Sequence, residues 1–371
     1  MLPLYKDLQN EPPGFTNAGN AGLWFNRFFN IYPEKIKSGF TGDKLDIFEG
    51  ERNKWFDDFV GKANESRDER NGVLEKQARR QIDLVHALRG CTEVYKTEWH
   101  FITGMGLPHP VENGFLWHPT MGVPYLPGAA VKGMVRSWLE VWGSDEEKNQ
   151  LLNLFGSDDK DPEKQNNAPQ AGDLIFFDAL PASGVQLGID IMTPHMGDWY
   201  AQGNNIKNIQ RESEKVPADW HDPVPIKYLV VKKAQFLFAI APRKKTHIKE
   251  ACDMMGALDA ALTYIGAGAK TAVGYGFFAK DEDKLTELNA PPEEYVRIKI
   301  KHEIEALGLG SIARMLGRDI NKTKESWGSD IDTYLECIKE VHGDTIRRWQ
   351  LSENKNEKKT FRVIFPEPDH Q

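Results

Sequence analysis

Residues 266–276, with the sequence GAGAKTAVGYG, carry the residue types best suited to holding a phosphate group. Residues without a bulky Cβ let the backbone come close to another polymer, while Lys270 and Thr271 add a cation and a hydroxyl. Tyr275 could offer its ring face to a nucleobase. The segment therefore predicts a loop that binds phosphodiesters, with Gly266, Gly268, Gly274 and Gly276 as its glycines. A glycine-rich turn that only closes a sheet is the alternative.

A second candidate phosphate site is the start of a helix in residues 124–136, PYLPGAAVKGMVR. The turn before Gly128 leaves backbone amides unpaired at the positive end of the helix dipole. Lys132 and Arg136 are four residues apart and so share one helix face beside those amides. This geometry suits backbone phosphates, although an ordinary solvated basic face would look the same.

The third feature is a local excess of basic residues that the overall charge conceals. The chain has 47 Lys and Arg against 55 Asp and Glu, a net charge of −8, so its bulk charge does not indicate a nucleic-acid partner. Between residues 227 and 249, however, no acidic residue interrupts the basic ones before Lys249. These are Lys227, Lys232, Lys233, Arg243, Lys244, Lys245 and Lys249. Such a patch beside a glycine-rich loop favours nucleic-acid binding over a merely solvated surface, and we include Lys227 and Arg243 in the expected site.

Asp190 and His195, in the run DIMTPH, are candidates for acid–base chemistry. His195 could act as a general acid or base, or as a metal ligand. No second histidine stands at ligand spacing, so a hydrogen-bonding structural role is the more common alternative. We include His195 in the expected nucleic-acid site, and we expect neither a metal nor a cofactor.

The three cysteines are odd in number and distant from one another in sequence. Cys91, Cys252 and Cys337 therefore predict neither a disulfide framework nor a thiolate zinc site, and fit a reducing cytoplasm. The N-terminus lacks a basic segment followed by an apolar run, and no apolar stretch approaches the roughly 18 residues of a membrane helix. The sequence predicts a soluble cytoplasmic protein with no membrane partner.

The elements that must position these residues begin with an aromatic segment, 20–29, which predicts a strand. Helical periodicity follows in residues 50–90, interpreted as an inserted helical hairpin with Val73, Leu74, Ala78, Ile82, Val85 and Leu88 on its apolar face. Residues 97–105 predict a strand and 106–122 a loop or hairpin. A helix should begin at Pro127 and Gly128 and end at Gly143, before a polar loop over 157–172.

The second half repeats this order. LIFFDALP and VQLGIDIMTP predict paired strands, 228–240 a strand pair, 248–265 a helix, and VGYGFFAK a further strand. Two such units predict an α+β, ferredoxin-like (RRM-like) core with an antiparallel sheet and helices on one face. The 371 residues exceed one ordinary domain. We expect this core at 15–290, with 199–225 as a long functional excursion, and a mostly helical extension at 291–371 with a possible strand at TFRVIF.

The chain resembles the RAMP proteins of CRISPR effector complexes, in particular the family of sixth subunits of the type III-B Cmr module. The resemblance rests on the proline-glycine helix start at 122–136, the glycine-rich loop at 266–276, DIMTPH, and the run DPVPIKYLVV at 222–231. It covers residues 20–280 in order. Ala129 and Ala130 stand where the family usually has hydroxyl residues, which removes two potential phosphate contacts.

This resemblance implies a non-catalytic backbone subunit that binds the guide RNA near its 3′ end, caps the stack of RAMP subunits and contacts other Cmr subunits and target RNA. It also implies that 199–225 acts as a thumb in the guide–target duplex. The alternative is a metal-independent RAMP endoribonuclease in which His195, with Lys270, activates the ribose 2′-hydroxyl. A third possibility is a structural interaction protein that touches no RNA.

Overall fold

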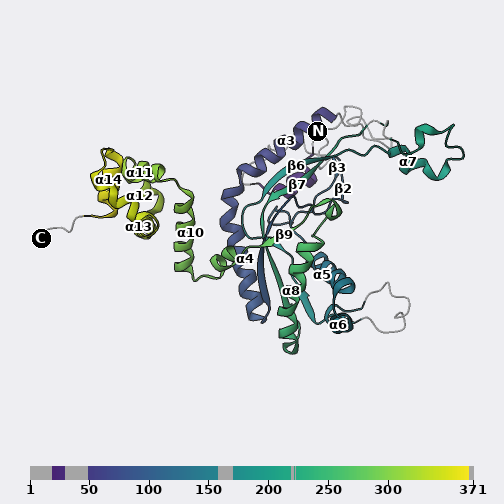
Figure 1. Ribbon diagram of the computed structural model, residues 1–371, viewed down its shortest axis with the longest axis horizontal. Coiled ribbons are helices and arrows are strands. Elements are labelled where there is room, and N and C mark those ends of the chain that lie inside the picture. Colours follow the sequence, from purple (N-terminus) through teal and green to yellow (C-terminus); the bar gives the residue numbers. More distant parts are fainter. Residues whose placement is uncertain (1–18, 30–48, 158–169, 219–220, 222, 367–371) are drawn as a thin grey trace, which may run out of the picture. The chain divides into compact units, whose positions relative to one another are not determined.

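The computed structural model describes residues 19–29, 49–157, 170–218, 221 and 223–366. Figure 1 shows the chain, which divides into two units, Met1–Glu282 and Asp283–Gln371. The division expected between residues 290 and 291 differs from this one by the short helix α9 (Glu282–Asn289).

A five-stranded antiparallel sheet organises the described part of the first unit. Its order is β4–β8–β1–β9, and β5 also pairs with β8. The strands are β1 (Cys91–Thr97), β4 (Leu174–Phe176), β5 (Leu180–Pro181), β8 (Gln235–Pro242) and β9 (Phe278–Lys280). Nearly every residue of β8 is buried because helices cover both of its faces.

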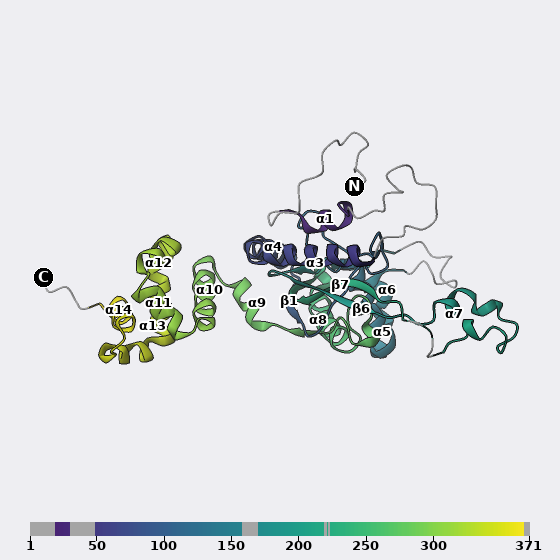
Figure 2. The same cartoon turned by 90° about the horizontal axis from the view of Figure 1, so that it is seen from above.

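Helices cover both faces of this sheet (Figure 2). One face is covered by α5 (Gly128–Trp142) and α8 (Ile248–Tyr264), which confirm the two predicted helices, with α6 (Asp145–Phe155) following α5. The other face is covered by α4 (Arg67–Ala87), where Val85 packs on the small side chains Ala239 and Ala241 of β8. The preceding helix α3 (Glu49–Glu65) packs on β6 (Gln186–Met192), a strand outside this sheet. The prediction of helices on one sheet face only was therefore incomplete.

The helical segment 50–90 is confirmed as helical, but not as a hairpin. In both views α3 and α4 follow one another around Ser66 along the sheet, α3 against β6 and α4 against β8 and β1. Leu74, Ala78, Ile82 and Val85 are buried as predicted. Val73 and Leu88 are exposed instead, because the buried stripe is narrower than the apolar residues suggest.

The predicted first strand is wrong: the segment forms helix α1 (Ala21–Arg27). The side chain of Asn20 accepts a hydrogen bond from the Leu23 amide (2.8 Å), which caps the helix N-terminus. Phe25 is fully buried, with its ring against those of Trp55 and Trp117. Aromatic content favoured a strand, whereas tertiary packing selected a helix.

A second, two-stranded ribbon is formed by β6 (Gln186–Met192) and β7 (Ile226–Lys233). The predicted pairing of LIFFDALP with VQLGIDIMTP is therefore wrong, since β4 and β5 pair with β8. The pairing expected within 228–240 is also wrong, because β7 and β8 belong to different sheets. A strand does not span 97–105; β1 ends at Thr97, and beyond it only an isolated bridge joins Phe101 to Val231.

Short elements complete the first unit. The predicted hairpin in 106–122 is present as β2 (Pro108–His109) and β3 (Glu112–Asn113). Between β6 and β7 the chain forms α7 (Gly197–Gln202) and the 3₁₀ turns η2 (Gly203–Asn205) and η3 (Ser213–Lys215). Figures 1 and 2 both show this segment projecting beyond the ends of the two strands. The polar loop expected at 157–172 lies mostly outside the described residues.

The cysteine prediction is wrong for one pair. Cys91 on β1 and Cys252 on α8 form a disulfide, with their Cα atoms 5.3 Å apart. The two residues are separated by 161 positions, so only the packing of α8 on β1 brings them together. Cys337, in the second unit, is free and buried.

The second unit is helical throughout its described residues. It comprises α9, α10 (Pro292–Ala306), α11 (Leu309–Gly317), α12 (Ile320–Trp327), η6 (Gly328–Asp330), α13 (Ile331–Arg348), η7 (Trp349–Leu351) and α14 (Lys355–Ile364). The strand expected at TFRVIF is wrong. Residues 360–364 of this run belong to α14, where the Thr360 hydroxyl donates to the carbonyl of Ala313. Across the described residues of both units, no helix has the length and apolarity to cross a bilayer.

Candidate nucleic-acid interface

The glycine-rich loop, defined as residues 266–276, is fixed to the chain that follows β1. The Gly276 amide donates to the carbonyl of His100 (2.8 Å), and the Ala269 amide donates to that of Ile102 (2.9 Å). A Cβ on Gly276 would lie 1.9 Å from the Ala267 oxygen, and one on Gly268 would lie 2.1 Å from the Ile102 oxygen. These two glycines are therefore required by the loop's own packing, as the alternative of a sheet-closing turn supposed.

The outer part of the loop presents backbone amides. Lys270 is left-handed (φ 61°) and precedes the 3₁₀ turn η5 (Thr271–Val273). Within the described part of the chain, the amides of Lys270, Thr271 and Ala272 donate no hydrogen bond to a protein group. A left-handed residue followed by right-handed ones points successive N–H groups into one concavity, which suits an anion.

The ammonium of Lys270 is held close to the ribbon without neutralisation. Its Nζ lies 5.0 Å from the centre of the Tyr228 ring and 3.8 Å from the sulfur of Met192. Among the described residues, no carboxylate forms an ion pair with it. A cation held over an aromatic ring keeps its charge available for an external anion.

Beneath Lys270 lies a hydrogen-bonded cluster of Asp190, His100, Tyr275 and Tyr228. The Tyr275 hydroxyl donates to Asp190 Oδ2 (2.7 Å), His100 Nδ1 lies 3.1 Å from the same oxygen, and the hydroxyls of Tyr228 and Tyr275 are 3.0 Å apart. Burial alone raises the pKa of Asp190, but hydrogen bonds from Tyr275, the Ile191 amide and His100 outweigh it, so that pKa lies below its ordinary value. Burial also raises the pKa of Tyr275.

This cluster changes the interpretation of two residues. Tyr275 was expected to offer its ring to a base, but its hydroxyl is used internally and its ring packs beside that of His100. His100 was not identified from the sequence, because it lies 90 positions from Asp190 and belongs to no motif. Asp190 pairs with His100, not with its sequence neighbour His195.

The start of α5 already holds an anion of the protein's own. The Gly128 amide donates to Asp178 Oδ1 (2.7 Å), and a Cβ on Gly128 would lie 2.3 Å from the Phe176 oxygen. Arg136 forms an ion pair with Glu140 (2.7 Å), one turn further along the helix. The prediction that the Gly128 amide is unpaired was therefore wrong, because Asp178 accepts its hydrogen bond. Lys132 is half-buried and, among the described residues, has no ion pair.

The basic residues between 227 and 249 do not form one surface. Lys227 faces the opposite side of β7 from Tyr228, since side chains alternate along a strand. Arg243 follows the far end of β8, about 26 Å of strand from Gln235, which lies near the loop-bearing end of β1. There Arg243 Nε donates to the Gly172 carbonyl (3.0 Å), and Lys244 pairs with Asp173 (2.9 Å).

His195 is exposed beyond the end of β6. The nearest polar group to its ring that the described residues provide is the His221 carbonyl, 3.5 Å from Nδ1. Neither Asp190 nor Lys270 contacts it. The pair of His195 with Lys270 expected for a ribonuclease is therefore not assembled.

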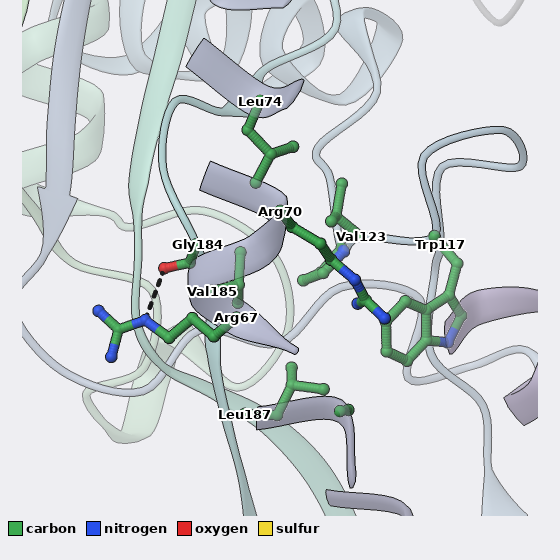
Figure 3. A pocket seen from close by; sticks show the side chains of 11 residues that line it. Arg67, Arg70, Leu74, Trp117, Val123, Gly184, Val185 and Leu187 are labelled. Atoms are coloured by element: carbon green, nitrogen blue, oxygen red, sulfur yellow. Dashed lines mark hydrogen bonds between the residues drawn. The ribbon is translucent and has the colours of Figure 1, made fainter. Parts of the chain in front are cut away.

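A cavity elsewhere in the first unit does not offer a ligand site (Figure 3). It has a volume of ≈ 10 Å³ and lies among Arg67, Arg70 and Trp117, which is room for about one water molecule. Arg67 Nε donates to the Gly184 carbonyl (3.1 Å) and Arg70 Nη2 to that of Gly19 (2.9 Å). The arginines thus bind the backbone, not an outside anion.

Fold and site together define an antiparallel α+β protein that presents a glycine-rich loop at one end of its sheet, with a cation and with amides that have no partner among the described residues. The chain belongs to the RAMP superfamily, whose family model matches residues 94–279. The matched region begins within β1 and ends within β9, so it contains the sheet, the ribbon and the loop.

Two curated relatives and one solved structure are similar to parts of the chain. The CRISPR system Cmr subunit Cmr6 of Pyrococcus furiosus is 27% identical over 264 residues; the match covers 55% of this chain and 72% of the relative. The protein of the same name from Saccharolobus solfataricus is 25% identical over 169 residues, 45% of this chain and 48% of the relative. A chain in the cryo-EM structure of the type III-B Cmr-beta complex bound to cognate target RNA is 20% identical. The match covers 71% of this chain and 86% of that one, with a TM-score of 0.40.

Proposed function

We propose that the chain is a non-catalytic RNA-binding backbone subunit of a type III-B CRISPR Cmr effector complex. The observation that carries this proposal is the outer glycine-rich loop, where the amides of Lys270, Thr271 and Ala272 lack protein partners and the Lys270 ammonium lacks a carboxylate within the described residues. Backbone amides with one cation bind a phosphodiester whatever its bases. Membership of the RAMP superfamily and the two Cmr6 relatives support the assignment to a Cmr complex.

The proposal includes a ferredoxin-like core. The chain order β1, α5, β4, β8, α8, β9 is that of a split βαβ pair, with the ribbon β6–β7 inserted between β4 and β8. In this arrangement α5 and α8 cover one sheet face and the loop after α8 leads back into the edge strand β9. The loop is therefore placed where the core and the ribbon meet.

The partners in this proposal are guide RNA, target RNA and other Cmr subunits, in the cytoplasm. The loop holds guide phosphates near the 3′ end, with Lys132 as an additional cation, and the subunit caps the stack. Sequence is then read by guide–target pairing and not by the protein. Residues 199–225, of which the parts in α7, η2 and η3 project beyond the ribbon, act as a thumb in the duplex. The Cys91–Cys252 disulfide would be an exception among cytoplasmic thiols.

Charge reversal tests the proposal. Lys270→Glu and Lys132→Glu are compared with the wild-type full chain for binding of a labelled single-stranded guide RNA, by fluorescence anisotropy at several salt concentrations. We expect weaker binding for both variants. The slope of log affinity against log salt should become shallower by about one for each lost phosphate contact.

Lys76→Glu is the matched control, because Lys76 is exposed on α4, across the sheet from α8. It should bind RNA as the wild type does. Unchanged affinity of Lys270→Glu at moderate salt contradicts the assignment of the loop. If, in addition, the wild-type chain gives no RNA crosslink in the assembled complex, the chain is an interaction protein that does not contact RNA.

Metal-independent RNA cleavage is a second candidate function, favoured by the contact of His100 with Asp190. A histidine oriented by a carboxylate can serve as a general base. Against this role, the His100 side chain is only 16% exposed, and its ring is stacked on that of Trp99 and tilted against that of Tyr275. The test is to incubate the purified full chain with repeat RNA in the presence of a chelator. A 2′,3′-cyclic phosphate product that is lost in His100→Ala but retained in His195→Ala would support cleavage by His100.

A further inference from the structure

Trp99 presents an aromatic surface to solvent beside the glycine-rich loop. Its side chain is 57% exposed, and its ring is stacked on that of His100, with centroids 4.5 Å apart and planes 15° from parallel. One ring face is thus supported from within and the other is open. An exposed aromatic ring that is held in place from one side can stack on a nucleobase with the other.

The support under Trp99 is rigid. His100 is fixed on its side chain by Asp190 and on its backbone by the Gly276 amide, which donates to the His100 carbonyl. Asp190 is in turn held by Tyr275. His100 therefore contacts the Trp99 ring, the polar cluster and the glycine-rich loop. These contacts fix the position of the Trp99 ring relative to the loop amides before any ligand binds.

Two exposed lysines lie on the strand segment that is aligned with the backbone of Trp99. Hydrogen bonds of Phe101 with Val231 (2.9 and 2.8 Å) and of the Thr97 amide with the Ala234 carbonyl (3.0 Å) align residues 97–101 with 231–234. This alignment places Trp99 alongside the exposed Lys232 and Lys233. Lys232 extends over Gly188, on the same face of the ribbon as Tyr228, over which Lys270 lies.

We propose that Trp99 is a stacking platform for one base of a single-stranded RNA whose phosphates are held by the glycine-rich loop. The proposal rests on the proposed function and adds a base contact to it. The Trp99 ring is stacked on His100, whose carbonyl accepts from the Gly276 amide of the loop, so a strand held by the loop amides has an aromatic surface nearby. Base and phosphate alternate along such a strand, and every base has a π-face to stack. The stacking role expected of Tyr275 therefore passes to Trp99.

The experiment measures the affinity of the full chain for a short single-stranded oligoadenylate and for the same probe with abasic riboses. Trp99→Ala should weaken binding of the intact probe by about 5- to 150-fold, the range for one stacked base. It should leave binding of the abasic probe and the salt slope unchanged. Trp99→Phe should retain most of the affinity, which a merely structural role does not require.

Trp142→Ala is the matched control. Trp142 is 58% exposed and is likewise stacked on a neighbour, Trp138, but it lies at the C-terminal end of α5. It should bind both probes as the wild type does. If Trp99→Ala binds the intact probe normally while Lys270→Glu does not, stacking is wrong and the proposed function stands. If the wild-type chain binds neither probe, both are wrong.

Discussion

The glycine-rich loop and the start of α5 look alike in sequence but differ in whether the fold has already supplied an anion. Both combine glycine with a lysine, and both were expected to bind phosphate. At α5 the Gly128 amide binds Asp178 and Arg136 binds Glu140. At the loop, the amides of residues 270–272 and the Lys270 ammonium have no such partner among the described residues. A phosphate-binding pattern is therefore diagnostic only when no internal carboxylate completes it.

The far end of β8 repeats the lesson. Three basic residues in sequence, Arg243, Lys244 and Lys245, suggested a surface for nucleic acid. Asp173 binds Lys244 and lies within 3.2 Å of His247, and the hydrogen bond from Lys244 is the main reason that the pKa of Asp173 lies below its ordinary value. Here too an acidic residue that is distant in sequence, Asp173, pairs with a residue of the basic run, so this part of the run makes a contact within the protein.

The sharpest way to break the comparison is to disturb the loop itself. Gly276→Ala introduces a Cβ against the Ala267 oxygen at φ 75°, and we expect a loss of about 3 to 5 kcal/mol in the free energy of unfolding. Urea unfolding measures it. In α5 the exposed Gly133 has open space around it, so Gly133→Ala should instead gain about 0.5 to 1 kcal/mol. A neutral Gly276→Ala would show that the loop is not fixed as described.

The next effect concerns the anion at α5. Asp178→Ala removes the acceptor of the Gly128 amide and a charge at the helix N-terminus, so stability should fall by about 1 to 2 kcal/mol. RNA affinity should not fall, because the carboxylate occupies the site and repels phosphate. Asp178→Asn keeps an acceptor and should lose less stability. Weaker RNA binding by Asp178→Asn would contradict an internal role.

A smaller effect, of about 1 kcal/mol at neutral pH, is expected for Asp190→Asn, which weakens the contacts with Tyr275 and His100. Because the folded pKa of Asp190 is below its ordinary 3.8, its stabilisation is complete above that value and is lost as the pH falls below it. The difference between wild type and variant in urea unfolding should therefore shrink on acidification below about pH 4. A constant difference would mean that the charge of Asp190 is unimportant.

The smallest effect is expected at Arg243. Arg243→Ala loses one hydrogen bond to the Gly172 carbonyl, about 0.5 to 1 kcal/mol of stability, and should leave RNA affinity unchanged. Anisotropy with the guide RNA, beside Lys270→Glu, gives the comparison. If both variants lost RNA affinity equally, both ends of β8 would have to contact RNA, which would contradict this prediction.

Much of the local structure could be predicted because it depends on neighbours in sequence. The bounds of α5 follow from Pro127 and Gly143, and those of α8 from the spacing of its apolar residues. The aromatic segment that became α1, and TFRVIF in α14, could not be assigned in this way. Short apolar runs fit either a strand or a helix, and the surrounding core decides between them.

The sequence by itself determined where the chain is helical or extended over its long periodic segments, and which loop is rich in glycine and alanine. Only the tertiary structure decided which groups are paired: Cys91 with Cys252, Asp190 with His100, and Gly128 with Asp178. The physical reason is range. Backbone preferences act within a few residues, whereas hydrogen bonds and charges act across a few ångströms of space between positions far apart in the chain.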